Sequence, residues 1–210
     1  MESFLAKYSL EHSSSEPELL QELSRETHLR VIQPRMLSEW SQGSLLQLLS
    51  QLVNPKYILE IGTFTGYSAL CLAKGLQPNG HLHTYEVDDE MLEIAEQFIP
   101  RSEHAKQITL HHQSALEGAP KLRCTFDLIF IDGDKREYCS YYSMAVDLIR
   151  SGGLIIADNV LWSGKILTEP ERNDKHTQEL IRFNNLVAND PRVEKVMLPL
   201  RDGLLLIRKI

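Results

Sequence analysis

Short apolar runs alternate with amphipathic segments along most of the chain. Apolar runs predict strands at 57–61, 81–86, 107–112, 126–132, 154–158, 193–198 and 204–208. Apolar residues at helical spacing predict intervening helices at 67–76, 88–99, 137–150 and, after a long polar loop, 175–189. Near-continuous apolar strands that alternate with helices are typical of a doubly wound α/β fold, with a mostly parallel sheet covered on both faces. The tight turn at 201–203 joins the last two strands and predicts one antiparallel strand.

Two more helices are predicted before the first strand. Ser15 and Glu18 have the spacing of a capping box, and Pro17 suits a first helical turn. A second helix is expected after Pro34 and should stop at Asn54. We expect a single domain over 1–210, in which 1–54 form a helical lid or dimer surface and 55–210 form the α/β core.

Composition narrows the class of protein. The 210 residues are 42% hydrophobic and 24% charged, as in soluble globular proteins. No apolar run approaches the roughly 18 residues that span a bilayer, and the first residues lack the pattern of a signal peptide. The three cysteines form no CxxC pair, which indicates a reducing, cytoplasmic location. A net charge of -7 gives no general attraction to nucleic acid or anionic membranes.

Four of the predicted strands end in an acidic residue. These residues are Glu60, Glu86, Asp132 and Asp158. Ligands of open α/β sheets bind outside the carboxyl ends of the strands. We therefore expect the chemistry of this protein at that edge of the sheet.

The segment after the first strand predicts a cofactor site. Gly62 and Gly66 allow a sharp turn and the close approach of a ligand to the backbone. Glu86 ends the second strand, where an acid can accept hydrogen bonds from both ribose hydroxyls of an adenosine-containing cofactor. The alternative is that these glycines only make a tight turn between a strand and a helix.

The glycine spacing selects among adenosine cofactors. A dinucleotide site requires G-x-G-x-x-G, whereas this chain has G-x-x-x-G with Phe64 in place of the second glycine. Phe64 would obstruct a pyrophosphate. Glu60 would repel phosphates but could hold a cationic amino-acid group, directly or through water. The sequence therefore favours S-adenosylmethionine (SAM) and disfavours an NAD-dependent dehydrogenase.

Two apolar strands that we expect to be neighbours end in Asp132 and in Asp158-Asn159. Carboxylates at buried strand ends are costly unless they are paired or bound to metal. Three oxygen ligands without sulfur or nitrogen favour Mg²⁺, Ca²⁺ or Mn²⁺. The alternative is that both aspartates cap the helices that follow them.

Four segments together resemble the cation-dependent class I O-methyltransferases, which include the plant caffeoyl-CoA and the animal catechol O-methyltransferases. They are LEIGTFTGYSAL (59–70), FIDGDKREY (130–138), DNVLWSG (158–164) and LPLRDGLLLIRK (198–209). The resemblance covers nearly the whole chain, and small bacterial members are the most similar. It implies a seven-stranded, Rossmann-like methyltransferase sheet with an antiparallel last strand, and it favours a homodimer.

The resemblance also implies roles for the matching residues. It implies metal ligation by Asp132, Asp158 and Asn159. It makes Lys135 the candidate general base, with an ion pair to Asp132 or Asp134 as the alternative. Plant members have an asparagine at the substrate-binding position of Ser163, so their acyl-CoA substrate is not carried over. The implied SAM contacts are Ser38, Glu60, Gly62, Ser68, Glu86, Ala115 and Asp134, with Met36 as a further candidate.

We therefore expect a divalent-cation-dependent transfer of the SAM methyl group to a hydroxyl of a catechol-type small molecule. Near-attack positioning of the reactants could contribute on the order of 7–11 kcal/mol. The alternative acceptor is a hydroxylated uridine in tRNA, but the negative net charge and the lack of a basic stretch count against it. Intact Asp132, Lys135, Asp158 and Asn159 also argue against a cofactor-binding protein without activity.

Overall fold

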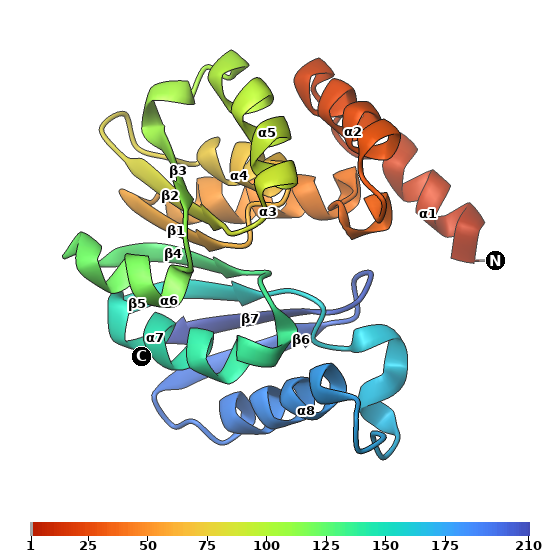
Figure 1. Cartoon of the computed structure of the whole chain (residues 1–210), viewed down its shortest axis with the longest axis vertical. Helices are drawn as coiled ribbons and strands as arrows, with labels where there is room; N and C mark the ends of the chain where they lie inside the picture. The colour runs from red at the N-terminus through yellow and green to blue at the C-terminus, as the bar shows by residue number, and fades with distance from the viewer. Residues whose placement is uncertain (1) are drawn as a thin grey trace.

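A seven-stranded sheet forms the middle layer of the computed structural model, which describes residues 2–210 (Figure 1). The strand order is β3-β2-β1-β4-β5-β7-β6, and only β7 runs antiparallel to its neighbours β5 and β6. The expected doubly wound sheet with an antiparallel last strand is thus confirmed. The strands are β1 (Tyr57–Ile61), β2 (His81–Glu86), β3 (Ile108–His112), β4 (Phe126–Ile131), β5 (Ile149–Ala157), β6 (Val193–Leu198) and β7 (Leu204–Lys209).

Helices cover both faces of this sheet (Figure 1). Helices α2 to α5 share one apolar core with one face, and α6 to α8 share a second core with the other. No helix in residues 2–210 is long and apolar enough to cross a membrane. The helices are α1 (Glu2–Glu11), α2 (Glu18–Arg30), α3 (Trp40–Val53), α4 (Tyr67–Ala73), α5 (Asp89–Phe98), α6 (Ala115–Gly118), α7 (Tyr138–Leu148) and α8 (Lys175–Ala188).

The start of α2 differs from the predicted capping box. Pro17 occupies the N-cap position in an extended conformation and gives no side-chain cap, so the helix begins at Glu18. Ser15 therefore lies too far upstream to cap the first turn. Glu16 instead accepts a hydrogen bond from the hydroxyl of Tyr67 on α4. By contrast, α5 has a side-chain cap, because Asp88 accepts from Glu90 N at 2.9 Å.

Helix α1 was not predicted from the sequence. Four of its apolar side chains are exposed, Phe4 by 77%, Leu5 by 63%, Tyr8 by 61% and Leu10 by 48%. A helix without a buried face has little of the amphipathic pattern on which sequence prediction depends.

Gly62 allows the loops after β1 and β4 to pack against each other. Its φ angle is +97°, and a Cβ atom there would lie 2.4 Å from the backbone oxygen of Asp132. Asp132 N in turn donates to Ile61 O at 2.8 Å. Only glycine accommodates both the left-handed conformation and this close approach. The turn after β1 therefore helps to fix the position of Asp132.

We predict that Gly62→Ala destabilises the fold more than Gly164→Ala. Gly164 also has a positive φ, of +78°, but a Cβ atom added there would meet no atom within 4 Å. Both variants carry left-handed strain of roughly 1–2 kcal/mol. Gly62→Ala adds an overpacking cost of roughly 1–3 kcal/mol against backbone atoms. Urea unfolding measures the difference, and equal losses in the two variants would contradict the packing role of Gly62.

Candidate active site

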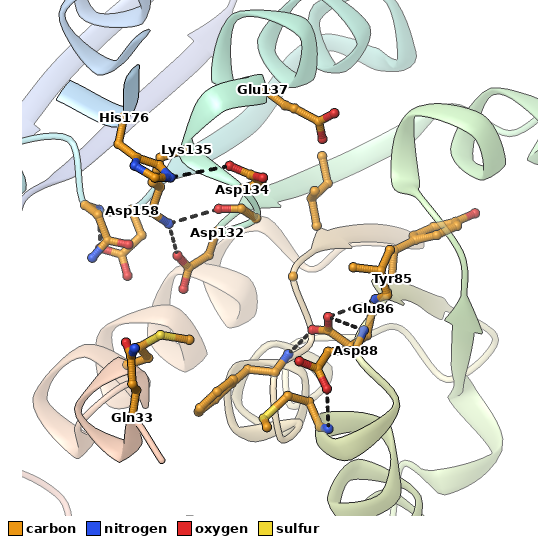
Figure 2. Close-up of a pocket in the computed structure, with 18 of the residues that line it drawn as sticks. Gln33, Tyr85, Glu86, Asp88, Asp132, Asp134, Lys135, Glu137, Asp158 and His176 are labelled. Carbon is orange, nitrogen blue, oxygen red and sulfur yellow. Dashed lines mark hydrogen bonds and ion pairs between the residues drawn. The ribbon is translucent and has the colours of Figure 1, made fainter. Parts of the chain in front are cut away.

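A cavity of about 1450 Å³ lies outside the carboxyl ends of β1, β2, β4 and β5. Figure 2 shows Asp132, Lys135 and Asp158 on one side of it, and Glu86 with Asp88 on the other. Ser38 and Ser68 line a small adjoining recess, together with Gly62 and Asp132. The predicted site residues on the cavity wall are Gly62, Glu86, Ala115, Asp132, Asp134, Lys135, Asp158 and Asn159.

Glu86 holds a fixed carboxylate at the end of β2. Its Oε1 accepts from Val87 N at 2.8 Å and from Asp88 N at 3.1 Å, and its Oε2 accepts from Phe64 N at 2.8 Å. Phe64, with φ at +49°, also lines the cavity. A carboxylate oriented in this way at the second strand end suits the two hydroxyls of a ribose.

Glu60 lies deeper than the sequence suggested. Its side chain is fully buried and lines neither the cavity nor the recess. Oε2 accepts from Thr84 Oγ1 at 2.6 Å, while Oε1 has no partner in the described part of the chain. Burial raises the pKa of Glu60 to about 8, which keeps this carboxyl mostly protonated at neutral pH. Its direct contact with the cofactor stays a prediction.

Asp132, whose side chain is partly buried, and Asp158, which is buried, form an acidic corner at the ends of β4 and β5. Burial raises the pKa of the Asp132 carboxyl, and the Lys135 ammonium opposes that shift. Burial, and then the charge of Asp132, raises the pKa of Asp158 to about 7. Asn159 follows with φ at +58° and donates its backbone N–H to Asp158 Oδ1 at 2.6 Å. Two like charges held close together in a buried corner favour the binding of a cation.

The chemistry of this corner fits a hard divalent cation. Two carboxylates and an amide offer oxygen ligands only, as Mg²⁺, Mn²⁺ and Ca²⁺ require. No group of three histidine, cysteine, aspartate or glutamate side chains within residues 2–210 is arranged to hold a metal. A cation here would therefore depend on Asn159 besides the two aspartates. Helix capping is not their role, because Asp134 caps the 3-10 helix η5 (Lys135–Glu137) and Leu161 occupies the N-cap of η6 (Trp162–Leu167).

Lys135 makes three contacts at this corner. Its Nζ donates to Asp132 Oδ1 at 2.7 Å, to Tyr138 Oη at 2.9 Å and to Gly133 O at 3.2 Å. The ion pair with Asp132, which the sequence left open, is therefore present. Asp134 instead pairs with Arg136. The contact with Asp132 places the amine of Lys135 directly beside the candidate cation ligands.

Several cavity residues carried no clear signal in the sequence. Gln42 on α3 reaches the acidic corner, and Arg201 reaches it from the turn between β6 and β7. Both depend on contacts between distant parts of the chain, which no local pattern indicates. The long loop after β5 also contributes, because Trp162, Ser163 and Lys165 line the cavity. The indole Nε1 of Trp162 is buried without a hydrogen-bond partner among the described residues.

Comparison with known proteins identifies the family. Residues 10–210 match the sequence model of the O-methyltransferase family. Caffeoyl-CoA O-methyltransferase 5 from Nicotiana tabacum is 33% identical over 98% of this chain and 91% of its own length.

Solved structures agree with this result. The O-methyltransferase from Bacillus cereus in complex with S-adenosylhomocysteine (SAH) has a TM-score of 0.90 and 30% identity, covering 97% of this chain and 96% of its own. The O-methyltransferase TomG from Streptomyces achromogenes, solved with SAM, has a TM-score of 0.89 and 30% identity, covering 96% and 94%.

These similarities rule against the alternative that the chain is an NAD-dependent dehydrogenase. The resemblance seen in the four sequence segments is confirmed over nearly the full chain. The chain belongs to the O-methyltransferase family and is a SAM-dependent O-methyltransferase of the caffeoyl-CoA O-methyltransferase type.

Proposed function

We propose that this O-methyltransferase depends on a divalent cation and methylates one hydroxyl of a catechol-type small molecule. Asp132, Asp158 and Asn159 hold the cation, which is Mg²⁺, Mn²⁺ or Ca²⁺. The observation that carries the proposal is the pair of carboxylates at adjacent strand ends, Asp158 buried and Asp132 partly buried, on the wall of the same cavity as Glu86. An acceptor with two adjacent oxygens suits such a centre because both oxygens can reach it together.

The reaction forms an O–CH₃ bond, breaks the S–CH₃ bond of SAM and releases the proton of the acceptor hydroxyl. A divalent cation at the corner would supply the positive charge that stabilises the acceptor oxyanion and lowers the pKa of its hydroxyl. Asp132, Asp158 and Asn159 hold and orient that charge. Phe64 and Trp162, which line the cavity, exclude water from the reacting groups.

Lys135 is the proposed general base. Its Nζ lies at the cation corner, 2.7 Å from Asp132 Oδ1. A hydroxyl proton released at the corner is therefore within reach of this amine once the amine is neutral. The hydrogen bond to Tyr138 Oη holds the amine in place, because Tyr138 is itself fixed by donating to Asp158 O at 2.9 Å.

The cofactor occupies the other side of the cavity in this proposal. Glu86 accepts hydrogen bonds from the ribose, and Gly62 and Asp134 contact the cofactor from the turns after β1 and β4. Ser38 and Ser68 contact the cofactor from the recess, and Ala115 contacts it from the cavity wall. Glu60, which lies beneath the cavity wall, holds the amino-acid group of the cofactor directly or through water. The segment before the first strand, 1–54, then serves as a lid or a dimer surface on the core at 55–210.

The cation dependence is tested with Asp158→Ala. We expect the variant to lose cation-stimulated methyl transfer to catechols but to bind SAH as the wild type does, since Glu86 and Gly62 are untouched. EDTA should stop wild-type turnover and Mg²⁺ or Mn²⁺ should restore it. The control is Asp147→Ala, at an exposed position of α7. Turnover that ignores EDTA, or methyl acceptance by tRNA but by no catechol, would refute the proposal.

The role of Lys135 is tested with Lys135→Met at saturating cation. We expect the rate of methyl transfer to fall by roughly 10²–10⁴, the usual contribution of a general base. Saturating cation separates this effect from the loss of the Asp132 ion pair. The matched control is Lys121→Met, at an exposed position. A Lys135→Met rate within threefold of the wild type would assign the proton transfer to another group.

A homodimer is tested by light scattering. Phe4, Leu5 and Tyr8 of α1 are each more than 60% exposed, and we expect a second copy of the chain to cover them. The measured mass should be about twice the 24.0 kDa of one chain, and Phe4→Glu with Tyr8→Glu should shift it toward the monomer. A wild-type mass of one chain at micromolar concentration would exclude the dimer.

A further inference from the structure

Gln42 connects the helical segment before β1 to the acidic corner. It lies in the first turn of α3, and its side chain is only 1% exposed. Its amide Nε2 donates to Asp158 Oδ2 at 2.6 Å. Gln42 thus hydrogen-bonds the carboxylate of a residue 116 positions later in the chain.

Arg201 determines which way the Gln42 amide points. Its Nη1 donates to Gln42 Oε1 at 3.0 Å. A guanidinium can only donate hydrogen bonds, so it donates to the oxygen end of the amide and leaves the NH₂ group facing Asp158. With the opposite orientation, an amide oxygen would face the carboxylate and repel it.

The backbone around Arg201 supports a role for its side chain. Arg201 has φ at +51°, a left-handed conformation that is uncommon for a residue with a side chain. The same turn is anchored to the loop after β5, because Leu161 N donates to Asp202 O at 2.9 Å. The guanidinium is therefore presented to Gln42 from a fixed turn, and both residues line the cavity.

We propose that Gln42 is a positioning residue for the cation site, with its amide oriented by Arg201 so that it fixes the Asp158 carboxylate for ligation. This inference rests on the proposed function, because it assigns a second layer of contacts to the proposed cation ligands. Partners that orient a metal-binding side chain commonly change metal affinity by roughly 10–100-fold. Gln42 has the geometry of such a partner, with one hydrogen bond to the ligand and one to the group that orients it.

The first test measures Mn²⁺ binding to the full chain by the loss of the EPR signal of the free ion. Gln42→Met keeps the length of the side chain and removes both hydrogen bonds. We expect its Kd for Mn²⁺ to rise by roughly 10–100-fold. Gln51→Met, at an exposed position of the same helix, should stay within twofold of the wild type.

A second control separates positioning from the packing of α3. Ser50 is buried on the same helix and donates from Oγ to Leu72 O at 2.6 Å, far along α3 from Asp158. Ser50→Ala should lower the thermal midpoint of unfolding and leave the Kd for Mn²⁺ unchanged. If Ser50→Ala weakens Mn²⁺ binding as much as Gln42→Met does, Gln42 has only a packing role and the proposal is overturned.

The contribution of Arg201 is tested by a double-mutant cycle with Arg201→Met. Arg201→Met also removes a positive charge near the bound cation, and this direct effect on the Kd is the same whether residue 42 is Gln or Met. It therefore cancels in the cycle. We expect Arg201→Met to raise the Kd by at least threefold more when Gln42 is present than when it is replaced by Met. Equal effects in both backgrounds would show that Arg201 does not act through Gln42.

The outcomes distinguish this inference from the proposed function. If the wild type binds Mn²⁺ and Gln42→Met binds it within threefold of the same Kd, the inference is wrong and the cation site stands. If the wild type binds no Mn²⁺, the cation site itself is wrong and the role of Gln42 falls with it.

Discussion

Two carboxylates, Asp132 and Asp158, share one corner of the cavity because of the register of the parallel sheet. Ile131 at the end of β4 pairs with Ala157 at the end of β5, so the next residues, Asp132 and Asp158, leave the sheet side by side. Asp158 N donates to Ile131 O at 3.0 Å and extends the ladder by one bond. The strand pairing therefore fixes the Cα atoms of Asp132 and Asp158 next to each other. Neighbouring side chains must therefore compensate the negative charge of the two carboxylates at this corner.

The groups around the corner follow from that requirement. The ammonium of Lys135 offsets the charge of Asp132, and Gln42 donates to Asp158. Even so, the pKa of Asp158 stays raised to about 7, because burial and the neighbouring carboxylate outweigh these contacts. Charge that the protein compensates only in part is suited to binding a cation, and this places the proposed chemistry at the corner.

The same strand alignment places the cofactor side beside this corner. Ile61 at the end of β1 pairs with both Tyr85 on β2 and Ile131 on β4. The turn at Gly62 and the carboxylate of Glu86 therefore open into the cavity that Asp132 also lines. A methyl donor on one side and a cation-held acceptor on the other would meet without any large rearrangement of the strands.

The sequence predicted the sheet well because buried strands read as continuous apolar runs. β1 and β2 have the predicted bounds, and three of the four predicted acids, Glu86, Asp132 and Asp158, line the cavity at the carboxyl edge of the sheet. The sequence did not predict the features that depend on tertiary contacts. Pro17 displaced the expected cap of α2, and α1 has no buried face to reveal it. The depth of Glu60 and the reach of Gln42 depend on packing between distant segments, which local periodicity does not encode.

The central claim is that Asp132, Asp158 and Asn159 together hold a divalent cation next to the methyl donor. Crystals grown with MnCl₂ and SAH, measured at the manganese absorption edge, test it most directly. The account predicts one strong anomalous peak at direct ligand distance from oxygens of all three side chains, at the acidic corner across the cavity from Glu86. An ordered site without such a peak, with the three side chains turned away from one another around bound SAH, would contradict it.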